Sequence, residues 1–326
     1  MFFPTYYGKK KSLARRFADS DFGYFLRHRI VPWLRLVRLP NLLTAFGDSL
    51  AGACLAAALN GTELSFWSVL DVCFCSIVLY MFGTIQNDWC DLPEDRRLRP
   101  ERPLPNRDIP VPAAALVAIA CLIVALLLAG LTGRITFILA LLLAVVISAY
   151  NFKLKHSLVS GAVSMGLCRG LNMLLGVSLV AITPAVILPV VGLILYIGCV
   201  TWLADGENRR QIPTRNIFYP PIALGVSWFI TQFFIPGETL WRAFLPSLLC
   251  MVVLIVIAVL AAKRLYNRSI QPSAMRKFIG TLIGLLIPWQ AAWVVFGATG
   301  HIIWVLVLAV VTWLLMKLAS KWIAQS

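Results

Sequence analysis

Long apolar stretches alternate with short polar segments along most of the chain. A helix of about 20 residues crosses the roughly 30 Å hydrocarbon core of a bilayer. Lipid offers no partner for unpaired backbone groups, so such spans must be helical. The pattern predicts ten transmembrane helices, at residues 42–59, 66–86, 111–131, 134–150, 161–181, 184–203, 217–235, 244–263, 279–298 and 301–320.

The composition agrees with lipid as the main solvent of this chain. Hydrophobic residues make up 60% of the 326 residues and charged residues only 13%, whereas soluble domains carry about 25% charged residues. The eight cysteines fall mostly inside the apolar stretches and form no CxxC pair, so we interpret them as packing residues. We predict an all-α, polytopic membrane protein with an N-terminal arm (1–40) and a single transmembrane domain (41–326).

The net charge of +15 is distributed by membrane side. Across the predicted topology, 26 of the 29 Lys and Arg residues fall on the face that carries both termini. The positive-inside rule places this face in the cytoplasm, and a bacterial inner membrane is the expected host. Topology and anionic lipid headgroups account for the basic charge, so nucleic acid is not expected as a partner.

Acidic residues are concentrated just after the second predicted span. Asp88, Asp91 and Asp95 stand at helical positions i, i+3 and i+7, which places them along one stripe. Three carboxylates held together require a cation, and with the Asn87 amide they form a hard oxygen donor set suited to Mg²⁺. Pro93 predicts a kink or break in this helix.

Arginines follow the acids directly and supply donors for phosphate oxygens. Their guanidinium groups match phosphate geometry, so a magnesium site beside them predicts a diphosphate pocket. The alternative is a solvated surface loop in which acids and bases neutralise one another. The arginines of this segment are Arg96, Arg97, Arg99, Arg102 and Arg107.

The same segment resembles a known family. NDWCDLPED, residues 87–95, is similar to the NDxxDxxxD signature of the UbiA superfamily of intramembrane prenyltransferases, and RPERPLP, residues 99–105, resembles its RP.RPLP continuation. Arg38, Pro40 and Asn41 resemble the start of the family's first helix. The resemblance implies a bundle of about nine or ten helices around a central cavity, with Mg²⁺, a prenyl diphosphate and a small acceptor.

Residues 150–176 form a second match, similar to the family's fourth loop and fifth helix. Within it, Arg169 and Asn172 lie at i and i+3 inside an apolar span, where a charge should face a cavity or a partner. Asp48 in the first span is a candidate partner for Arg169. Pairing for stability alone is the alternative role of this arginine. The expected diphosphate-binding residues are Asn41, Arg96, Arg102, Lys153, Lys155, Arg169 and Asn172.

A second acidic motif, which the family carries after its sixth helix, is reduced here to Asp205 and Glu207. Local salt bridges with nearby arginines are an alternative role for these two acids. From the resemblance we expect Asp88, Asp91, Asp205 and Glu207 as catalytic residues. The expected metal ligands are Asn87, Asp88, Asp91, Asp95 and Asp205.

These features predict an enzyme that ionises a magnesium-bound prenyl diphosphate and transfers the prenyl group to an acceptor. Two other classes of protein share some of these features. Asp205, Gly206 and Arg210 match part of the DxxDGxxAR motif of CDP-alcohol phosphotransferases. Trp202 stands in place of the first aspartate of that motif and Arg209 in place of its alanine, so the motif is not complete. A transporter or non-catalytic isoprenoid-binding protein suits the many helices, but it does not require the acid and arginine cluster.

Overall fold

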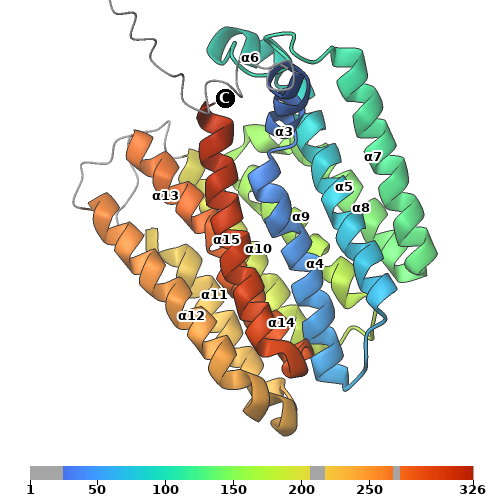
Figure 1. The fold of residues 1–326 in the computed structure, drawn as a ribbon, viewed down its shortest axis with the longest axis vertical. Helices are drawn as coiled ribbons and strands as arrows, with labels where there is room; N and C mark the ends of the chain where they lie inside the picture. Colours follow the sequence, from blue (N-terminus) through green and yellow to red (C-terminus); the bar gives the residue numbers. More distant parts are fainter. Residues whose placement is uncertain (1–24, 206–216, 267–271, 326) are drawn as a thin grey trace, which may run out of the picture.

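The computed structural model describes residues 25–205, 217–266 and 272–325, and these parts form one helical bundle (Figure 1). The first half has five long helices. They are α4 (Leu39–Asn60), α5 (Phe66–Cys90), α7 (Val111–Thr132), α8 (Arg134–Phe152) and α9 (Leu158–Val177). Two short helices, α3 (Val31–Leu36) and α6 (Leu92–Leu98), lie at the same end of the bundle as the C-terminal end of α15 (Figure 1).

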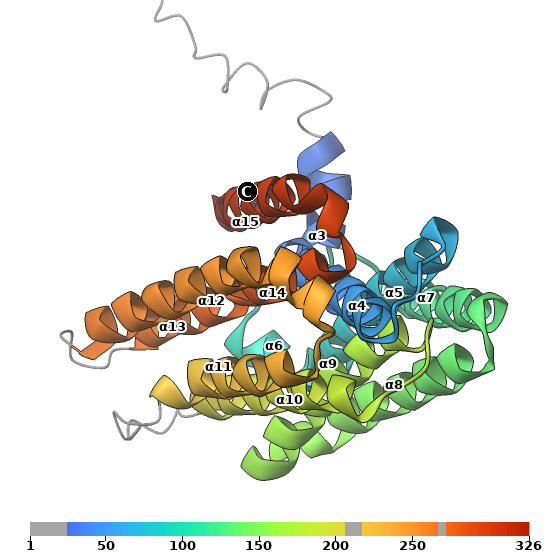
Figure 2. The ribbon, with the colours of Figure 1, turned by 90° about the horizontal axis from the view of Figure 1, so that it is seen from below.

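The second half continues the bundle. Its helices are α10 (Pro184–Asp205), α11 (Tyr219–Thr231), α12 (Gly237–Tyr266), α13 (Pro272–Gly284), α14 (Leu286–Gly297) and α15 (Ile302–Gln325). Seen from below, α15 lies at the edge of the bundle beside α3 (Figure 2). Only 6% of its most apolar window is buried, as expected for a helix that faces lipid.

Nine helices of the described chain are long and apolar enough to cross a membrane, which confirms the predicted multi-span helical class. The predicted seventh span is not among these nine, because α11 has only 13 residues and then becomes a 3-10 turn at Gln232–Phe234. The predicted ninth span is divided at Leu285 into α13 and α14. Pro288 explains the break, since it has no N–H to donate to the Gly284 carbonyl four residues earlier.

Glycines allow the central helices to approach closely. A Cβ added to Gly176 in α9 would collide with the Ser49 carbonyl of α4, and one added to Gly52 would collide with the Met173 carbonyl of α9. Packing between helices in lipid depends on small residues of this kind, because lipid tails provide no hydrophobic driving force for association. The α4 helix is therefore held tightly against α9.

Candidate functional site

The predicted acidic segment is positioned by a break between α5 and α6. The α5 helix ends at Cys90, Asp91 links it to α6, and Pro93 lies in the first turn of α6. The Asp95 N–H still donates to the Asp91 carbonyl at 2.8 Å, so the backbone remains in a compact turn. The predicted interruption at Pro93 is confirmed, and it keeps the acidic side chains together at one end of the bundle.

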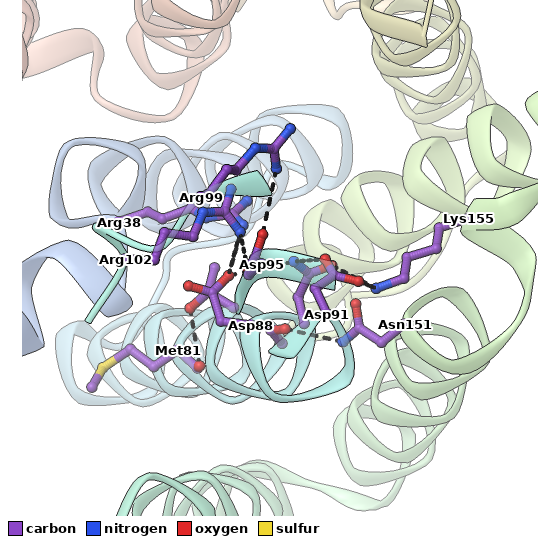
Figure 3. A network of polar contacts seen from close by, with 12 residues as sticks. Arg38, Met81, Asp88, Asp91, Asp95, Arg99, Arg102, Asn151 and Lys155 are labelled. Carbon is purple, nitrogen blue, oxygen red and sulfur yellow. Dashed lines mark hydrogen bonds and ion pairs between the residues drawn. The ribbon is translucent and has the colours of Figure 1, made fainter. Parts of the chain in front are cut away.

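Two arginines hold Asp88 and Asp95 (Figure 3). The Arg38 Nη2 atom lies 3.1 Å from Asp88 Oδ1, and Arg102 Nη1 lies 2.6 Å from Asp95 Oδ2 and 3.7 Å from Asp88 Oδ1. Arg99 lies farther away, 3.9 Å from Asp95. Arg102 therefore bridges two carboxylates that are seven residues apart in sequence.

Asp91 is contacted from α5 itself and from the segment after α8. The Asn87 amide donates to Asp91 Oδ2 at 3.1 Å and approaches Asp88 Oδ1 at 3.5 Å. Lys155 donates to the other Asp91 oxygen, and its Nζ lies 3.4 Å from Asn87 Oδ1. The contacts run without a gap from Asp95 to Lys155 (Figure 3).

Burial makes these pairings necessary. The Asp88 and Asp95 side chains are 8% and 3% exposed, and a buried carboxylate without a partner is strongly destabilising. Burial disfavours the charge of Arg38, but the Asp88 carboxylate, together with Tyr80 and Tyr150, outweighs this effect, and the pKa of Arg38 is raised. Arg38 also adopts a left-handed conformation with φ 51°, which costs on the order of 1 kcal/mol in a non-glycine residue. The residue with this unfavourable backbone conformation is therefore the one whose side chain contacts Asp88.

The donor set fits a magnesium ion chemically. Oxygens of Asp88 and Asp91 lie within 3.5 Å of one Asn87 nitrogen, so two carboxylates and an amide converge on a small volume. Hard oxygen ligands of this type suit Mg²⁺, which also accepts phosphate oxygens as ligands. Within the described residues, however, no three acidic, His or Cys side chains already stand in metal-binding proximity, because basic partners hold the carboxylates.

A cavity of about 140 Å³ extends from this cluster into the bundle. It is lined by α4, α5, α8 and α9, with Asn87 and Arg38 at the end nearest the acidic cluster and Arg169 deeper in the bundle. Leu79, Leu143 and Ile147 are among the apolar residues of its walls. Arg38 and Asn87 therefore connect the polar cluster with a mainly apolar space between helices.

A second polar group lies deeper, inside the membrane-spanning region. The fully buried Asp48 pairs with Arg169 at 3.1 Å, which confirms the predicted partner. The amides of Asn172 and Gln290 donate to Asp48 at 3.3 Å and 2.7 Å. Arg169 lies eleven residues beyond Leu158, the first residue of α9, which is about 16 Å along the helix. Arg169 and Asn172 thus contact Asp48 rather than the acidic cluster.

The remaining predicted site residues are not part of the contacts described above for Asp88, Asp91 and Asp95. Arg96 and Lys153 are exposed, and Asn41 lies in the first turn of α4, where its carbonyl accepts a hydrogen bond from Thr44. Asp205 is the last residue of α10, and Glu207 lies outside the described residues. The joint role of these two acids stays a prediction.

Sequence reasoning did not include Arg38 or Gln290 among the site residues. Arg38 was visible only as part of the Arg-Leu-Pro-Asn start of the first span. The Asn151 side-chain amide donates a hydrogen bond to Gln86 Oε1 at 2.9 Å and so links α8 to α5. The signal for Gln290 was an amide inside an apolar span, which requires a polar partner.

Fold and site together define a multi-pass integral membrane protein in which a charged cluster at one end of the bundle borders a mainly apolar cavity. The model of the UbiA prenyltransferase family matches residues 49–279, which is more than half of the chain. This chain belongs to the UbiA prenyltransferase family, and the predicted resemblance is confirmed.

Curated relatives and solved structures agree with this assignment. Digeranylgeranylglyceryl phosphate synthase from Methanococcus maripaludis is 29% identical over 135 residues, 40% of this chain and 46% of the relative. The Methanothrix thermoacetophila protein of the same name is 31% identical over 144 residues, 44% of this chain and 52% of the relative. The chain thus spans about half the length of the curated relatives it matches. The fold resembles that of a UbiA homolog from Archaeoglobus fulgidus bound to GPP and Mg²⁺, with a TM-score of 0.58, 16% identity and coverage of 81% of this chain and 99% of that chain.

Proposed function

We propose that this protein transfers a prenyl group from a prenyl diphosphate to a small acceptor within the membrane. The observation that carries the proposal is an acid and base cluster whose members Arg38 and Asn87 line one end of a mainly apolar cavity, since a prenyl diphosphate has the same division into a charged head and an apolar tail. The names of the curated relatives, which are prenyl-transferring synthases, support this chemistry.

The diphosphate would lie against the basic members of the cluster. Arg38 and Arg102 offer guanidinium groups, and Lys155 offers an ammonium group, all beside the acidic motif. Charged donors of this kind bind phosphate oxygens strongly and stabilise the charge that develops on a leaving diphosphate. Arg96, Lys153 and Asn41 belong to the same membrane face and are proposed to assist.

Magnesium fits this site, and its ligands would be Asn87, Asp88, Asp91, Asp95 and Asp205. When bound, Mg²⁺ supplies electrostatic stabilisation for the departing diphosphate. The α5 and α10 helices are the second and sixth spans, so Asp91 and Asp205 end on the same membrane side. Asp205 and Glu207 are proposed to complete the site or to accept the acceptor's proton. The apolar cavity walls exclude water from the allylic cation after the carbon–oxygen bond breaks.

The positive-inside rule supports a cytoplasmic location for this face of the protein, and a bacterial inner membrane stays the proposed host. The face carries α6, α3 and the end of α15 (Figure 1). The diphosphate head would therefore bind at the cytoplasmic face.

A second candidate function is isoprenoid binding without catalysis. The reduced second acidic segment favours it, since only Asp205 and Glu207 remain as acids there. The two functions differ in whether diphosphate is released.

A transfer assay tests the proposal. The purified full chain in lipid nanodiscs would receive Mg²⁺, labelled allylic diphosphates and a panel of small acceptors, and diphosphate release and prenylated product would be measured. We expect Asp91→Asn to lower the rate about 100-fold, the typical cost of removing one electrostatic stabiliser. Glu94→Gln is the matched control, because Glu94 is an exposed acid three residues away on α6.

Equal rates for Asp91→Asn and the unmodified protein would remove the proposed role of the acidic motif. Tight diphosphate binding without any product would favour the second candidate function.

A further inference from the structure

A second hollow lies between the C-terminal ends of α5 and α8. It is an open groove of about 290 Å³, and of its lining residues Asn151 alone is shared with the interior cavity. A single water molecule requires about 10–15 Å³ of such space, so the groove has room for a much larger group. Among the described residues, no acidic side chain lines it. The groove is therefore a separate candidate site, and the proposed transferase reaction does not assign its occupant.

The basic part of the groove is formed by Lys155 and His156, in the turn between α8 and α9. The Lys155 Nζ atom donates to Asp91 and lies 3.4 Å from Asn87 Oδ1 (Figure 3). An ammonium group has three donors, so one N–H of Lys155 remains for a ligand in the groove. The exposed His156 imidazole has no side-chain partner within the described residues, and an imidazole offers at least one N–H in either protonation state. Both side chains can therefore donate to an anion in the groove.

Two aromatic residues mark the level of the groove in the membrane. Trp89 of α5 and Phe152 of α8 both line it, and their rings meet edge to face with centroids 6.4 Å apart. They are 46% and 58% exposed and lie in the last turns of two apolar helices. Aromatic rings at the ends of apolar spans lie at the level of the lipid headgroups. The groove thus opens where the phosphate groups of the bilayer are found.

An apolar stripe of α8 continues from the groove toward the middle of the membrane. Phe152, Val145 and Ile138 follow one another at intervals of seven residues, or about two helical turns, and each is more than half exposed. A lipid with its phosphate in the groove can therefore place an acyl chain along this stripe. A basic groove above an apolar stripe matches an amphiphile rather than a soluble phosphate.

We propose that this groove binds one anionic phospholipid of the surrounding bilayer. Lys155 and His156 hold its phosphate, and its glycerol region lies against Trp89 and Phe152. Basic pockets between membrane helices on the cytoplasmic side are typical sites for anionic headgroups. A zwitterionic headgroup binds less tightly, because its ammonium group is repelled by Lys155. The inference does not depend on the proposed transferase function.

Native mass spectrometry of the purified full chain in detergent micelles tests the proposal. Phosphatidylglycerol and phosphatidylcholine with identical acyl chains would be titrated separately, with inorganic phosphate and glycerol phosphate as soluble competitors. We expect one phosphatidylglycerol molecule to bind about tenfold or more tightly than phosphatidylcholine, as one additional charged contact allows. The soluble phosphates should not displace it at equal concentration. Equal affinity for the two lipids, or displacement by either soluble phosphate, would overturn the proposal.

Variants locate the bound lipid in the groove. His156→Ala should weaken phosphatidylglycerol binding about tenfold, because a hydrogen bond to a charged group is lost. Phe152→Ala should also weaken it, although this variant removes no donor. Both side chains are exposed, so the helical signal in circular dichroism should not change. Lys153→Gln is the matched control, because Lys153 is an exposed base in the same turn that does not line the groove. It should alter binding by no more than about twofold.

Unchanged binding in His156→Ala and Phe152→Ala would overturn the proposed site. Equal losses in His156→Ala and Lys153→Gln would also overturn it, because the lipid would then be attracted to the basic surface as a whole. The titrations measure lipid binding and not turnover, so a failure of the proposed transferase function would leave their result unaffected.

Discussion

Removal of the Arg169 guanidinium should destabilise the protein strongly, because its partner Asp48 lies fully buried between helices. In Arg169→Met the Asp48 carboxylate keeps only the amide donors of Asn172 and Gln290, at 3.3 Å and 2.7 Å. Breaking a buried ion pair from one side costs about 3–5 kcal/mol. A charge at mid-membrane depth costs about 2.5–3.5 kcal/mol on insertion scales. Since two donors remain, we expect a loss of about 3 kcal/mol.

The double variant Asp48→Asn with Arg169→Met separates the pair from its components. It leaves no uncompensated charge, so it should cost less than Arg169→Met alone. Unfolding would be followed by denaturant titration of the protein in detergent micelles, with α-helical signal as the readout. Arg134→Met is the control, because Arg134 is exposed at the start of α8 and should change stability by less than about 0.5 kcal/mol.

A destabilisation below about 1 kcal/mol in Arg169→Met would refute the reasoning, since the charge of Asp48 would then have another stable environment. A double variant that is as unstable as Arg169→Met would show that the packing of the side chains, and not their charges, holds α4 against α9.

Two further outcomes follow from the packing and from the cluster. Gly176→Ala should destabilise the protein by about 1–3 kcal/mol, because the added Cβ would collide with the Ser49 carbonyl. Gly225→Ala is the control, because no atom lies within 4 Å of the added Cβ. It should be neutral or stabilising in the same denaturant titration. Lys155→Met should weaken diphosphate binding about tenfold or more in a displacement assay, because a charge-assisted hydrogen bond is lost. The control Lys153→Met changes an exposed side chain and should weaken binding less. Equal effects of the two variants would contradict a role of Lys155 in binding the diphosphate.

The helical spans were predictable from the sequence because lipid imposes a length and a composition on each of them. The predicted and observed helices differ where the backbone hydrogen bonding of a helix is interrupted within an apolar stretch. Pro288 divides the predicted ninth span without changing its hydropathy, and α11 ends after 13 residues although the apolar pattern continues to residue 235. Hydropathy reports the environment of a segment, not the continuity of its hydrogen bonds.

The acidic part of the site was predictable from local spacing, but its partners were not. Arg38 meets Asp88 across 50 positions, Lys155 meets Asp91 across 64, and Gln290 meets Asp48 across 242. Such pairs depend on which helices are neighbours, and amphipathic periodicity is weak in spans surrounded by apolar material on every side. Only the Asp48 and Arg169 pair was inferred, because each charge alone would be too costly in the membrane.

The balance of charge in the cluster connects stability with the proposed function. Among the described residues, the carboxylates of Asp88, Asp91 and Asp95 meet four cations, supplied by the Arg38, Arg99, Arg102 and Lys155 side chains. The acids therefore need no metal ion to remain buried. A metal ion alone would compete with these bases, and a diphosphate alone would compete with these acids. Together the two ligands nearly cancel in charge, so their joint binding exchanges partners without leaving a buried charge uncompensated. If the proposed function holds, binding of magnesium and binding of diphosphate favour each other, and this linkage must be equal in both directions.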